Sequence, residues 1–573
     1  MPLRPFIVAL ALTAALAAQT KPVPAPSAAE QNEAQKAAAL WRDRAERLTN
    51  ASIEEGWHIR PWDAVMKAHL AEAWWKDDPA RAHQWLSEAY EDVTFQRKNE
   101  GDDEHIERLR VATYIFEVLN RIDTAKADQL LKFIIADSEK LGEANSLRSQ
   151  ALLQVILQNA TTDALDNGAA RAEEIAEKAL QLRGNQYLPE IIGSIRYQDE
   201  AWADQFYIKA LNTAVESNDY DMVFGLMQFP FPYFDSRMKA SNAVRDEATS
   251  IFAQFLSHVP KDQDDNQKYC ERAPNIAQHL LPQLPVSQQG LIHAAIETCQ
   301  SSAEGPKHDW IDSDACTTAD SCLKLAAEAD SPNRSARLKE LAAIRAIQDE
   351  HDPQRAVEIV RSLTDDEKSV LQNWMEDYKM YAMAAIDGMY KQQDTPGIQQ
   401  IIDRAPAQLR ADMLLNFVGT LSTGKKPDPD YARIMLTEAR RALEGSPTQN
   451  PQTYMQLLRA YQRLFPEEAP QALGFVIAGL NQIEYLDPKA AKKSAAFRYV
   501  RLGDNLIPLP LKALLLERDE SYTLAAIKTL DDPKGRIAFR LGLLNASLKR
   551  YEEELQKAKT PAKPATKQAA NVH

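Results

Sequence analysis

The chain of 573 residues is 45% hydrophobic and 26% charged, proportions that are typical of folded proteins and exclude wholesale disorder. Its formal net charge at pH 7 is −15, so it lacks the excess of Lys and Arg that binding to nucleic acid or to anionic lipid requires. We therefore expect neither nucleic acid nor a lipid surface as a partner.

The N-terminus has the pattern of an export signal. Residues 1–18 contain one charged side chain, Arg4, followed by an apolar run over 6–12 and by a small-x-small pattern of the kind found at cleavage sites over 15–18. That run is too short to span a bilayer, and no later run reaches membrane length, so we expect no membrane-spanning segment. Residues 19–30 are rich in Pro and Ala and predict an extended linker. We expect the chain to be exported, to the periplasm or outside the cell.

A helical pattern recurs from residue 82 almost to the C-terminus. Counting from an alanine, apolar side chains follow at +3, +4, +7 and in most copies +8, which places them on one face of a helix. The copies start at Ala82, Ala127, Ala172, Ala203, Ala356, Ala432 and Ala472, and the first three are evenly spaced, 45 residues apart. Even spacing indicates an internal repeat.

Aspartates that can cap a helix stand just before several of these copies. Asp78, Asp123, Asp352 and Asp428 are such residues, and proline follows three of them at the first helical position. A further apolar helix precedes each cap, so the unit is a helical hairpin that buries its apolar face only by stacking on its neighbours. The sequence thus predicts an all-α fold, a superhelical stack of hairpins, with one repeat region over 31–214 and another over 336–548.

The second helix of the hairpin resembles that of tetratricopeptide-type repeats. The resemblance lies in the pattern small, x3, large, x2, small, as in Ala82, Leu86 and Ala89, and it recurs from Ala203 and Ala432. The first-helix signature of that family is not visible and the repeat length varies, so the likeness is to the α-solenoid superfamily. It implies a protein-binding scaffold.

The segment 215–335 interrupts the regular pattern. Prolines alternate with aromatic residues over 229–234, which cannot form the interior of a helix. All four cysteines of the chain also lie in this segment, and in an exported protein they favour two disulfides, for which three connectivities are possible. We expect Cys270–Cys299 and Cys316–Cys322. A zinc site would need cysteines at tighter, paired spacing, so we expect no metal, and no motif indicates a cofactor. The segment is predicted to be an irregular joint between two solenoid halves.

Aromatic residues offer a possible ligand-binding surface. The N-terminal third holds six of the nine tryptophans, which indicates either a carbohydrate-binding groove or packing between hairpins. Core packing is the preferred interpretation for most of them. Trp57 and Trp62 flank a turn and are the best candidates for exposure, and Phe229, Phe231 and Tyr233 are further candidates to face a ligand.

One glutamate suggests an enzymatic alternative. Glu216-Ser217 followed by Gly225 to Gln228 resembles the catalytic signature of soluble lytic transglycosylases, which implies a general acid and base acting on peptidoglycan. The family places more residues between the glutamate and the glycine, and its downstream tyrosine-containing element has no match here. Metalloprotease, phosphate-loop and serine-hydrolase motifs are also missing from the sequence, so we expect no catalysis.

Residues 549–573 have no apolar stripe and predict a disordered Lys/Ala/Pro tail. The sequence therefore predicts an exported scaffold that binds a protein or peptide partner on its concave face through the first helices of successive hairpins. A peptidoglycan-binding or lytic-transglycosylase-like envelope protein, with glycan as its ligand, is the alternative, and a purely structural spacer is a third possibility.

Overall fold

The computed structural model describes residues 26–560 with internal gaps. The gaps are 58, 60, 96–101, 139–156, 158–160, 162–164, 166–168, 182–187, 227–240, 262–265, 268, 271–272, 274–276, 278–285, 302–315, 372–373, 424–427, 447–449 and 484–506. The predicted signal segment 1–18, most of the linker and the aromatic residues Phe229, Phe231 and Tyr233 lie outside the described residues.

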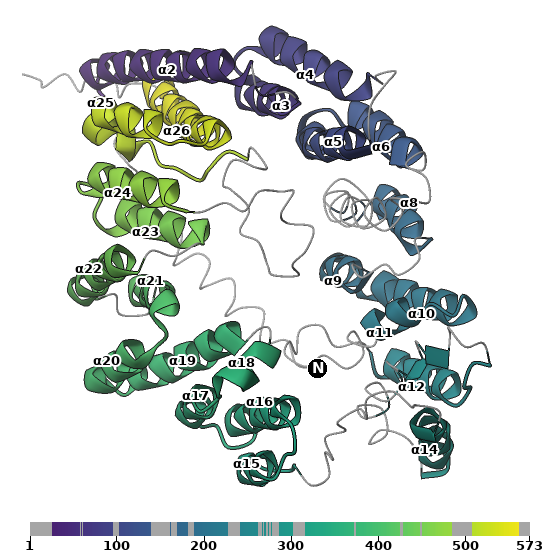
Figure 1. Ribbon diagram of the computed structural model, residues 1–573. Helices are drawn as coiled ribbons and strands as arrows, with labels where there is room; N and C mark the ends of the chain where they lie inside the picture. The colour runs from purple at the N-terminus through teal and green to yellow at the C-terminus, as the bar shows by residue number, and fades with distance from the viewer. Residues whose placement is uncertain are drawn as a thin grey trace, which may run out of the picture. The chain divides into compact units, whose positions relative to one another are not determined.

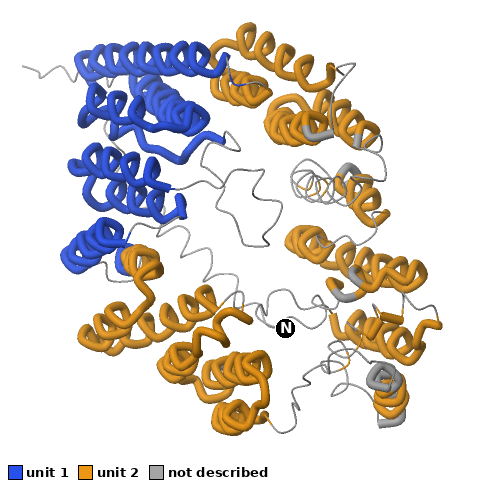
Figure 2. The backbone as a smooth tube through the Cα atoms, viewed as in Figure 1, with its two compact units in different colours: residues 1–59, 421–573 blue, residues 60–420 orange. Residues whose placement is uncertain are grey.

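Every regular element among the described residues is a helix, so the described chain is all-α (Figure 1). It divides into two compact units (Figure 2), one formed by residues 60–420 and the other by 1–59 together with 421–573. None of the described helices is both long enough and apolar enough to cross a membrane.

The unit of residues 60–420 is a succession of helical hairpins. Packed neighbours include α3 with α4, α5 with α6, α9 with α10, α16 with α17 and α19 with α20 (Figure 1). Its helices are α3 (Asp63–Trp74), α4 (Pro79–Thr94), α5 (Asp102–Ile122), α6 (Thr124–Ser138), α8 (Ala169–Leu180), α9 (Leu188–Gln198), α10 (Glu200–Glu216), α11 (Tyr220–Leu226), α12 (Asn242–Leu256), α14 (Val286–Ser301), α15 (Ala319–Ala327), α16 (Pro332–Gln348), α17 (Pro353–Arg361), α18 (Asp365–Val370), α19 (Trp374–Lys391), α20 (Thr395–Arg404) and most of α21 (Ala407–Thr423).

The recurring helical pattern is confirmed as a set of helices with buried faces. The alanines that start the seven copies are at most 2% exposed and lie in α4, α6, α8, α10, α17, α22 (Pro429–Gly445) and α24 (Ala469–Asn481). The capping aspartates are confirmed too, because the carboxylates of Asp78, Asp123, Asp352 and Asp428 each accept a hydrogen bond from the backbone N–H three residues on, at 3.0 to 3.2 Å. Local sequence signals therefore determine where these second helices begin.

The segment predicted to be irregular, 215–335, contains helices. They are α11, α12, α14 and α15, and α16 also begins inside it at Pro332. Ser241 caps α12 through Val244 N–H at 3.3 Å, and that helix buries Ala248, Phe252 and Leu256 on one face. The prediction was wrong because irregular structure, indicated locally by the prolines and cysteines, was expected over the whole segment. The amphipathic helical pattern in fact continues on both sides of the gap at 227–240.

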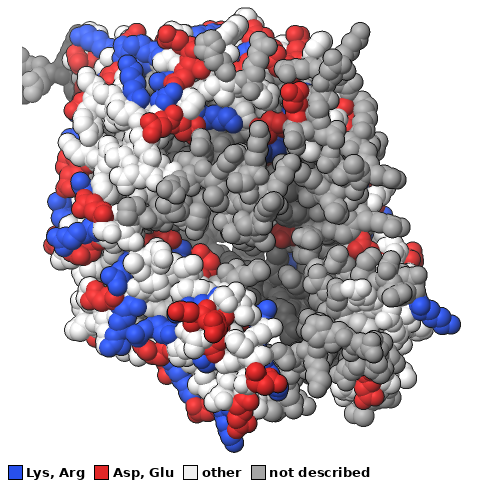
Figure 3. All heavy atoms as spheres, in the orientation of Figure 1, with Lys and Arg blue, Asp and Glu red and all other residues white. Residues whose placement is uncertain are grey.

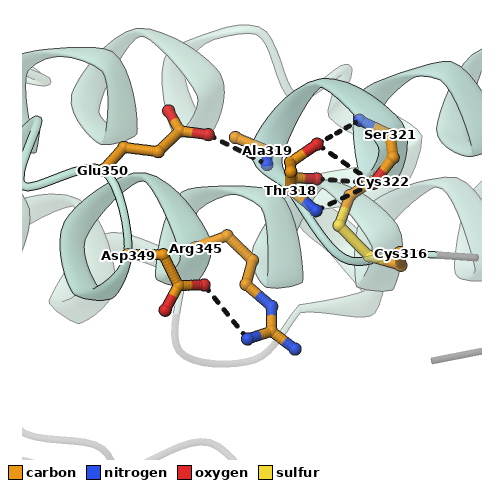
Figure 4. The surroundings of a disulfide bond; sticks show 8 residues. All are labelled: Cys316, Thr318, Ala319, Ser321, Cys322, Arg345, Asp349 and Glu350. Carbon is orange, nitrogen blue, oxygen red and sulfur yellow. Dashed lines mark hydrogen bonds and ion pairs between the residues drawn. A yellow bond between two sulfur atoms is a disulfide. The ribbon is translucent and has the colours of Figure 1, made fainter. Parts of the chain in front are cut away.

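The predicted Cys316–Cys322 disulfide is confirmed, and it lies at the start of α15 (Figure 4). Thr318 caps that helix by accepting a hydrogen bond from Ser321 N–H at 3.2 Å, and the carboxylate of Glu350 accepts one from Ala319 N–H at 3.1 Å. Cys270 is also disulfide-bonded. The side chain of Cys299, its predicted partner, lies outside the described residues.

The other unit joins both ends of the chain. Its helices are α2 (Ala28–Gly56), α22, α23 (Pro451–Leu464), α24, α25 (Leu514–Lys528) and α26 (Pro533–Lys559), and α2 packs along α26 (Figures 1 and 2). Glu55 of α2 forms ion pairs with Arg536 and Arg540 of α26. Arg44 Nε of α2 lies 2.7 Å from a carboxylate oxygen of Glu520 in α25.

Two predicted boundaries change in this unit. The linker expected over 19–30 ends at Ser27, whose hydroxyl caps α2 by accepting a hydrogen bond from Glu30 N–H at 3.3 Å. The tail expected from 549 begins later, because α26 continues to Lys559. Leu548 and Tyr551 are buried in its later turns, so the apolar stripe reaches further than the sequence analysis placed it.

Charges of both signs are interspersed over the described residues on the face drawn in Figure 3. Many of them pair one helical turn apart, as Arg440 and Glu444 do at 3.3 Å. Such exposed pairs each contribute on the order of 0.3–0.5 kcal/mol, so packing of the apolar faces, and not surface charge, stabilises the hairpins.

Candidate ligand-binding pocket

A pocket of about 250 Å³ lies between α17, α19 and α20, within the unit of residues 60–420. Its lining combines cationic, anionic and apolar side chains. The arginines are Arg355, Arg361 and Arg404, the carboxylates are Asp352 and Glu358, and the remaining lining residues are Gln354, Val357, Tyr378, Met389, Gly397, Gln400 and Ile401.

Two helices present their lining residues with the same spacing. From α17 the stripe is Gln354, Val357, Glu358 and Arg361, with Arg355 beside it, and from α20 it is Gly397, Gln400, Ile401 and Arg404. Positions i, i+3, i+4 and i+7 share one face of a helix, so each helix turns one continuous stripe toward the pocket. The pocket is therefore framed by two second helices of neighbouring hairpins, with the first helix α19 between them in sequence.

Aspartate caps fix where both helices begin. Asp352 accepts a hydrogen bond from Arg355 N–H and Asp394 accepts one from Gly397 N–H, each at 3.0 Å. A Cβ atom at Gly397 would lie 2.2 Å from the Asp394 carboxylate and 3.0 Å from the sulfur of Met389, so a larger residue would have to displace the capping carboxylate. The capped turn of α20 is thus held tightly against α19 at the edge of the pocket.

Two guanidinium groups share one carboxylate at the pocket. Arg361 Nη1 lies 2.9 and 3.0 Å from the two carboxylate oxygens of Glu358, and Arg404 Nη1 lies 3.7 Å from one of them. When the side-chain amide of Gln400 is placed with its oxygen toward Arg404, that oxygen accepts a hydrogen bond from Arg404 Nη2 at 2.6 Å. Arg355 is held separately, by Glu350 at 2.7 Å and by Asp320 of α15. The positive charge near Arg361 and Arg404 is therefore only partly neutralised.

Tyr378 of α19 lines the same pocket and carries a buried polar group. Its side chain is 1% exposed, and its hydroxyl has no hydrogen-bond partner among the described residues. Burial raises the pKa of this hydroxyl, which lies near Arg361 and Glu358, so it stays protonated at neutral pH. A buried hydroxyl without a partner costs roughly 1–3 kcal/mol, and a ligand that accepts a hydrogen bond would remove that cost.

The tryptophans named as possible ligand contacts have different surroundings. Trp57, just after α2, is 61% exposed as predicted. Trp62 is 2% exposed, which contradicts the expectation that it is accessible. Its indole N–H donates to the Glu107 carboxylate at 2.6 Å and its ring centroid lies 5.6 Å from that of Tyr114. A partner for the N–H allows the indole to be buried, and nothing in the sequence near Trp62 indicates this partner.

Glu216, the candidate general acid, is the last residue of α10 and is exposed to solvent. Gly225 lies in the short helix α11, and the two residues after Leu226 that complete the compared motif lie outside the described residues. In the described part of the chain, no group of three or more His, Cys, Asp or Glu side chains lies close enough to hold a metal ion.

The sequence analysis named none of the pocket residues as a functional site. The capping Asp352 and the buried stripe of α17 were recognised, but as structural signals. A second signal was available in Asp394-Thr395-Pro396, a cap of the same kind, followed by polar residues at the spacing found in α17. Together they indicate two similar helices, yet only the structure shows that their stripes line one pocket.

Comparisons with known proteins do not assign the chain to a family. No family model matches it, and no curated protein does. Among solved structures, it is similar to a circular tandem repeat protein with novel repeat topology and enhanced subunit contact surfaces, at 11% sequence identity, with 90% of this chain and 98% of that chain covered and a TM-score of 0.21. A TM-score this low does not establish a shared fold, so the evidence for a helical-repeat architecture is the set of helices described above.

Proposed function

We propose that this chain is an exported helical-repeat scaffold, without catalytic activity, that binds a protein or peptide partner at the pocket between α17, α19 and α20. The observation that carries the proposal is the buried, unpartnered hydroxyl of Tyr378 beside two arginines that share one carboxylate. The Tyr378 hydroxyl and the N–H groups of Arg361 that do not contact Glu358 are donors without an acceptor among the described residues.

The size of the pocket favours part of a larger partner as the ligand. Its volume of about 250 Å³ is below the roughly 300–1,000 Å³ of pockets that enclose whole small molecules. Stacked hairpins present a long row of side chains, so a partner anchored in the pocket would find further contacts on neighbouring helices. The pocket mixes apolar and charged groups, which suits a peptide segment.

The chemistry of the pocket supports binding more than catalysis. Arginine cannot be deprotonated in proteins, so it does not serve as a general base. Glu358 is engaged in ion pairs with Arg361 and Arg404, and the raised pKa of Tyr378 makes its hydroxyl a poor nucleophile. The glycan-cleaving alternative gains no support, because a general acid needs a desolvated site and Glu216 is exposed.

Two features support export. Residues 1–18 have the pattern of a signal peptide, and the Cys316–Cys322 disulfide is of the kind that persists in oxidising compartments. The disulfide lies at the start of α15, which contributes Asp320 to Arg355 at the pocket. An oxidising compartment would therefore favour the observed arrangement around this arginine.

Affinity capture tests the proposal. The chain from Gln19 onward is immobilised and exposed at micromolar concentration to the exported proteins of its source organism, with retained proteins identified by mass spectrometry. Wild type and the Arg361→Gln variant are compared. Loss of a charge-assisted hydrogen bond worth roughly 1.5–3 kcal/mol should weaken retention of the partner about tenfold or more.

Arg345→Gln is the matched control, because Arg345 forms an exposed pair with Asp349 at 3.1 Å on α16, outside the pocket lining. It should retain the partner as wild type does. Failure of the wild-type chain to retain any saturable partner, or equal retention by both variants, would overturn the proposal.

A further inference from the structure

We infer that the pocket binds the C-terminal carboxylate of a peptide, together with the side chain of its last residue. This inference rests on the proposed function, because it names the chemical group that the pocket of the scaffold recognises.

The charge of the lining fits one negative charge. Arg361 and Arg404 have only the carboxylate of Glu358 between them, so one positive charge at this pair has no adjacent counter-charge. Arg355 is paired with Glu350 and Asp320, and the carboxylate of Asp352 caps α17, so neither changes the charge at that pair. A carboxylate neutralises this excess, whereas a phosphate would bring nearly twice the charge next to Asp352 and Glu358.

The available donors fit a carboxylate. Arg361 contacts Glu358 through Nη1 only, and its Nε and Nη2 have no partner among the described residues. These two nitrogens form the planar fork that binds both oxygens of a carboxylate. The Tyr378 hydroxyl is a further donor, and it makes no hydrogen bond among the described residues. A ligand that carries an acceptor would satisfy it.

The shape and the apolar lining favour the end of a chain. A pocket of about 250 Å³ matches a terminal carboxylate with one side chain better than a segment that runs through it, so a carboxylate on a side chain in mid-sequence is a poorer fit. Val357, Met389 and Ile401 provide apolar contacts for the last side chain. The amides of Gln354 and Gln400 can pair with the peptide groups just before the terminus.

Peptide binding with modified ends tests the inference. Pools of short peptides of randomised sequence are made with free C-terminal carboxylates and again with C-terminal amides, and their binding to the full chain is measured by competition against a fluorescent pool. Free carboxylates should bind about tenfold more tightly or better, because the amide lacks the charge that strengthens the hydrogen bonds to Arg361. Equal binding by the two pools overturns the inference.

A third pool, with amidated ends and internal Asp and Glu, separates the two sources of carboxylate. Binding by this pool as tight as that of the free-ended pool overturns the assignment to the chain end. The Tyr378→Phe and Arg361→Gln variants should both lose the preference for free ends, while Arg345→Gln keeps it. Tyr378→Phe removes a buried hydroxyl without a partner, so its loss of binding cannot be ascribed to a weakened fold.

The outcomes distinguish this inference from the proposed function. If wild type captures a partner that Arg361→Gln does not, yet free and amidated ends bind equally, the inference fails and the scaffold function stands. If no pool binds and no partner is captured, both fail.

Discussion

A single buried carboxylate, Glu367 of α18, shows how this fold accommodates charge. It is 4% exposed. It accepts hydrogen bonds from Ser335 Oγ at 2.5 Å, Lys339 Nζ at 2.8 Å and Thr364 N–H at 2.7 Å. Burial alone raises the pKa of a carboxyl group, but here these contacts outweigh burial and lower the pKa of Glu367 from 4.5 to about 2. The carboxylate therefore links α16 to the start of α18.

This carboxylate predicts a specific acid sensitivity. Because the folded-state pKa is lowered, the stabilisation is complete above pH 4.5, and it is lost as the pH falls from there to about 2. Glu367→Gln should lower the free energy of unfolding at pH 7. Between pH 4.5 and about 2 the wild-type chain should lose up to roughly 3 kcal/mol of stability through Glu367, and the variant should not show that loss. Urea unfolding at a series of pH values measures both effects.

Asp365→Asn serves as the control, because Asp365 lies in the same helix and is fully exposed, at 3.5 Å from Lys368. Its pH profile should follow that of wild type. Parallel profiles for wild type and Glu367→Gln would contradict the prediction.

At the scale of elements, one glycine sets how closely α23 and α24 approach. A Cβ atom at Gly479 would lie 2.2 Å from Cε1 of Tyr454, a ring that is fully buried and has no room to move. Gly479→Ala should therefore lower the free energy of unfolding by roughly 1–3 kcal/mol, as overpacking of cores does. Thermal unfolding followed by circular dichroism measures the change.

The same substitution at Gly290 in α14 is the comparison, since nothing lies within 4 Å of the position of a Cβ atom there. In that exposed helical position alanine should stabilise by up to about 1 kcal/mol. A destabilisation of equal size at both sites would show that the ring of Tyr454 is not the cause.

Helix starts and buried stripes were predictable because their causes are local. Asp78 and Asp352 cap the helices that follow them, and the alanine-based stripes of α4 and α17 are buried as the spacing indicates. The burial of Trp62 was not predictable, because its partner Glu107 is 45 residues away. The pocket was missed for the same reason, since Arg361 and Arg404 meet through packing that neither helix specifies alone.

At the scale of the whole molecule, the pairing of α2 with α26 is a feature that no sequence pattern indicated. The buried stripe of Ala34, Ala38, Trp41 and Ala45 shows that α2 packs against an apolar surface, but the stripe does not indicate which helix supplies that surface. A helix at the start of a repeat array commonly caps the next repeat, whereas α2 belongs to a compact unit with residues 421–573.

Removal of α26 tests this pairing. A chain that ends after Asp532 should lose hydrogen-exchange protection along α2, because the apolar face of α2 loses the helix against which it packs and Glu55 loses its ion-pair partners Arg536 and Arg540. Protection of α5, in the other unit, should not change. Glu55→Gln, which keeps the packing and removes only the ion pairs, should cause a smaller loss. Full protection of α2 in the shortened chain would rule out α26 as its main partner.

The pairing of α2 with α26 also imposes an order on folding during synthesis. Glu55 and Arg536 are 481 positions apart. At ribosomal rates of about 5–20 residues per second, roughly 25 to 100 s pass between the appearance of the two helices. Residues 60–420 are continuous in sequence and can fold within that interval. During this interval the apolar face of α2 lacks α26, the helix against which it packs in the complete chain.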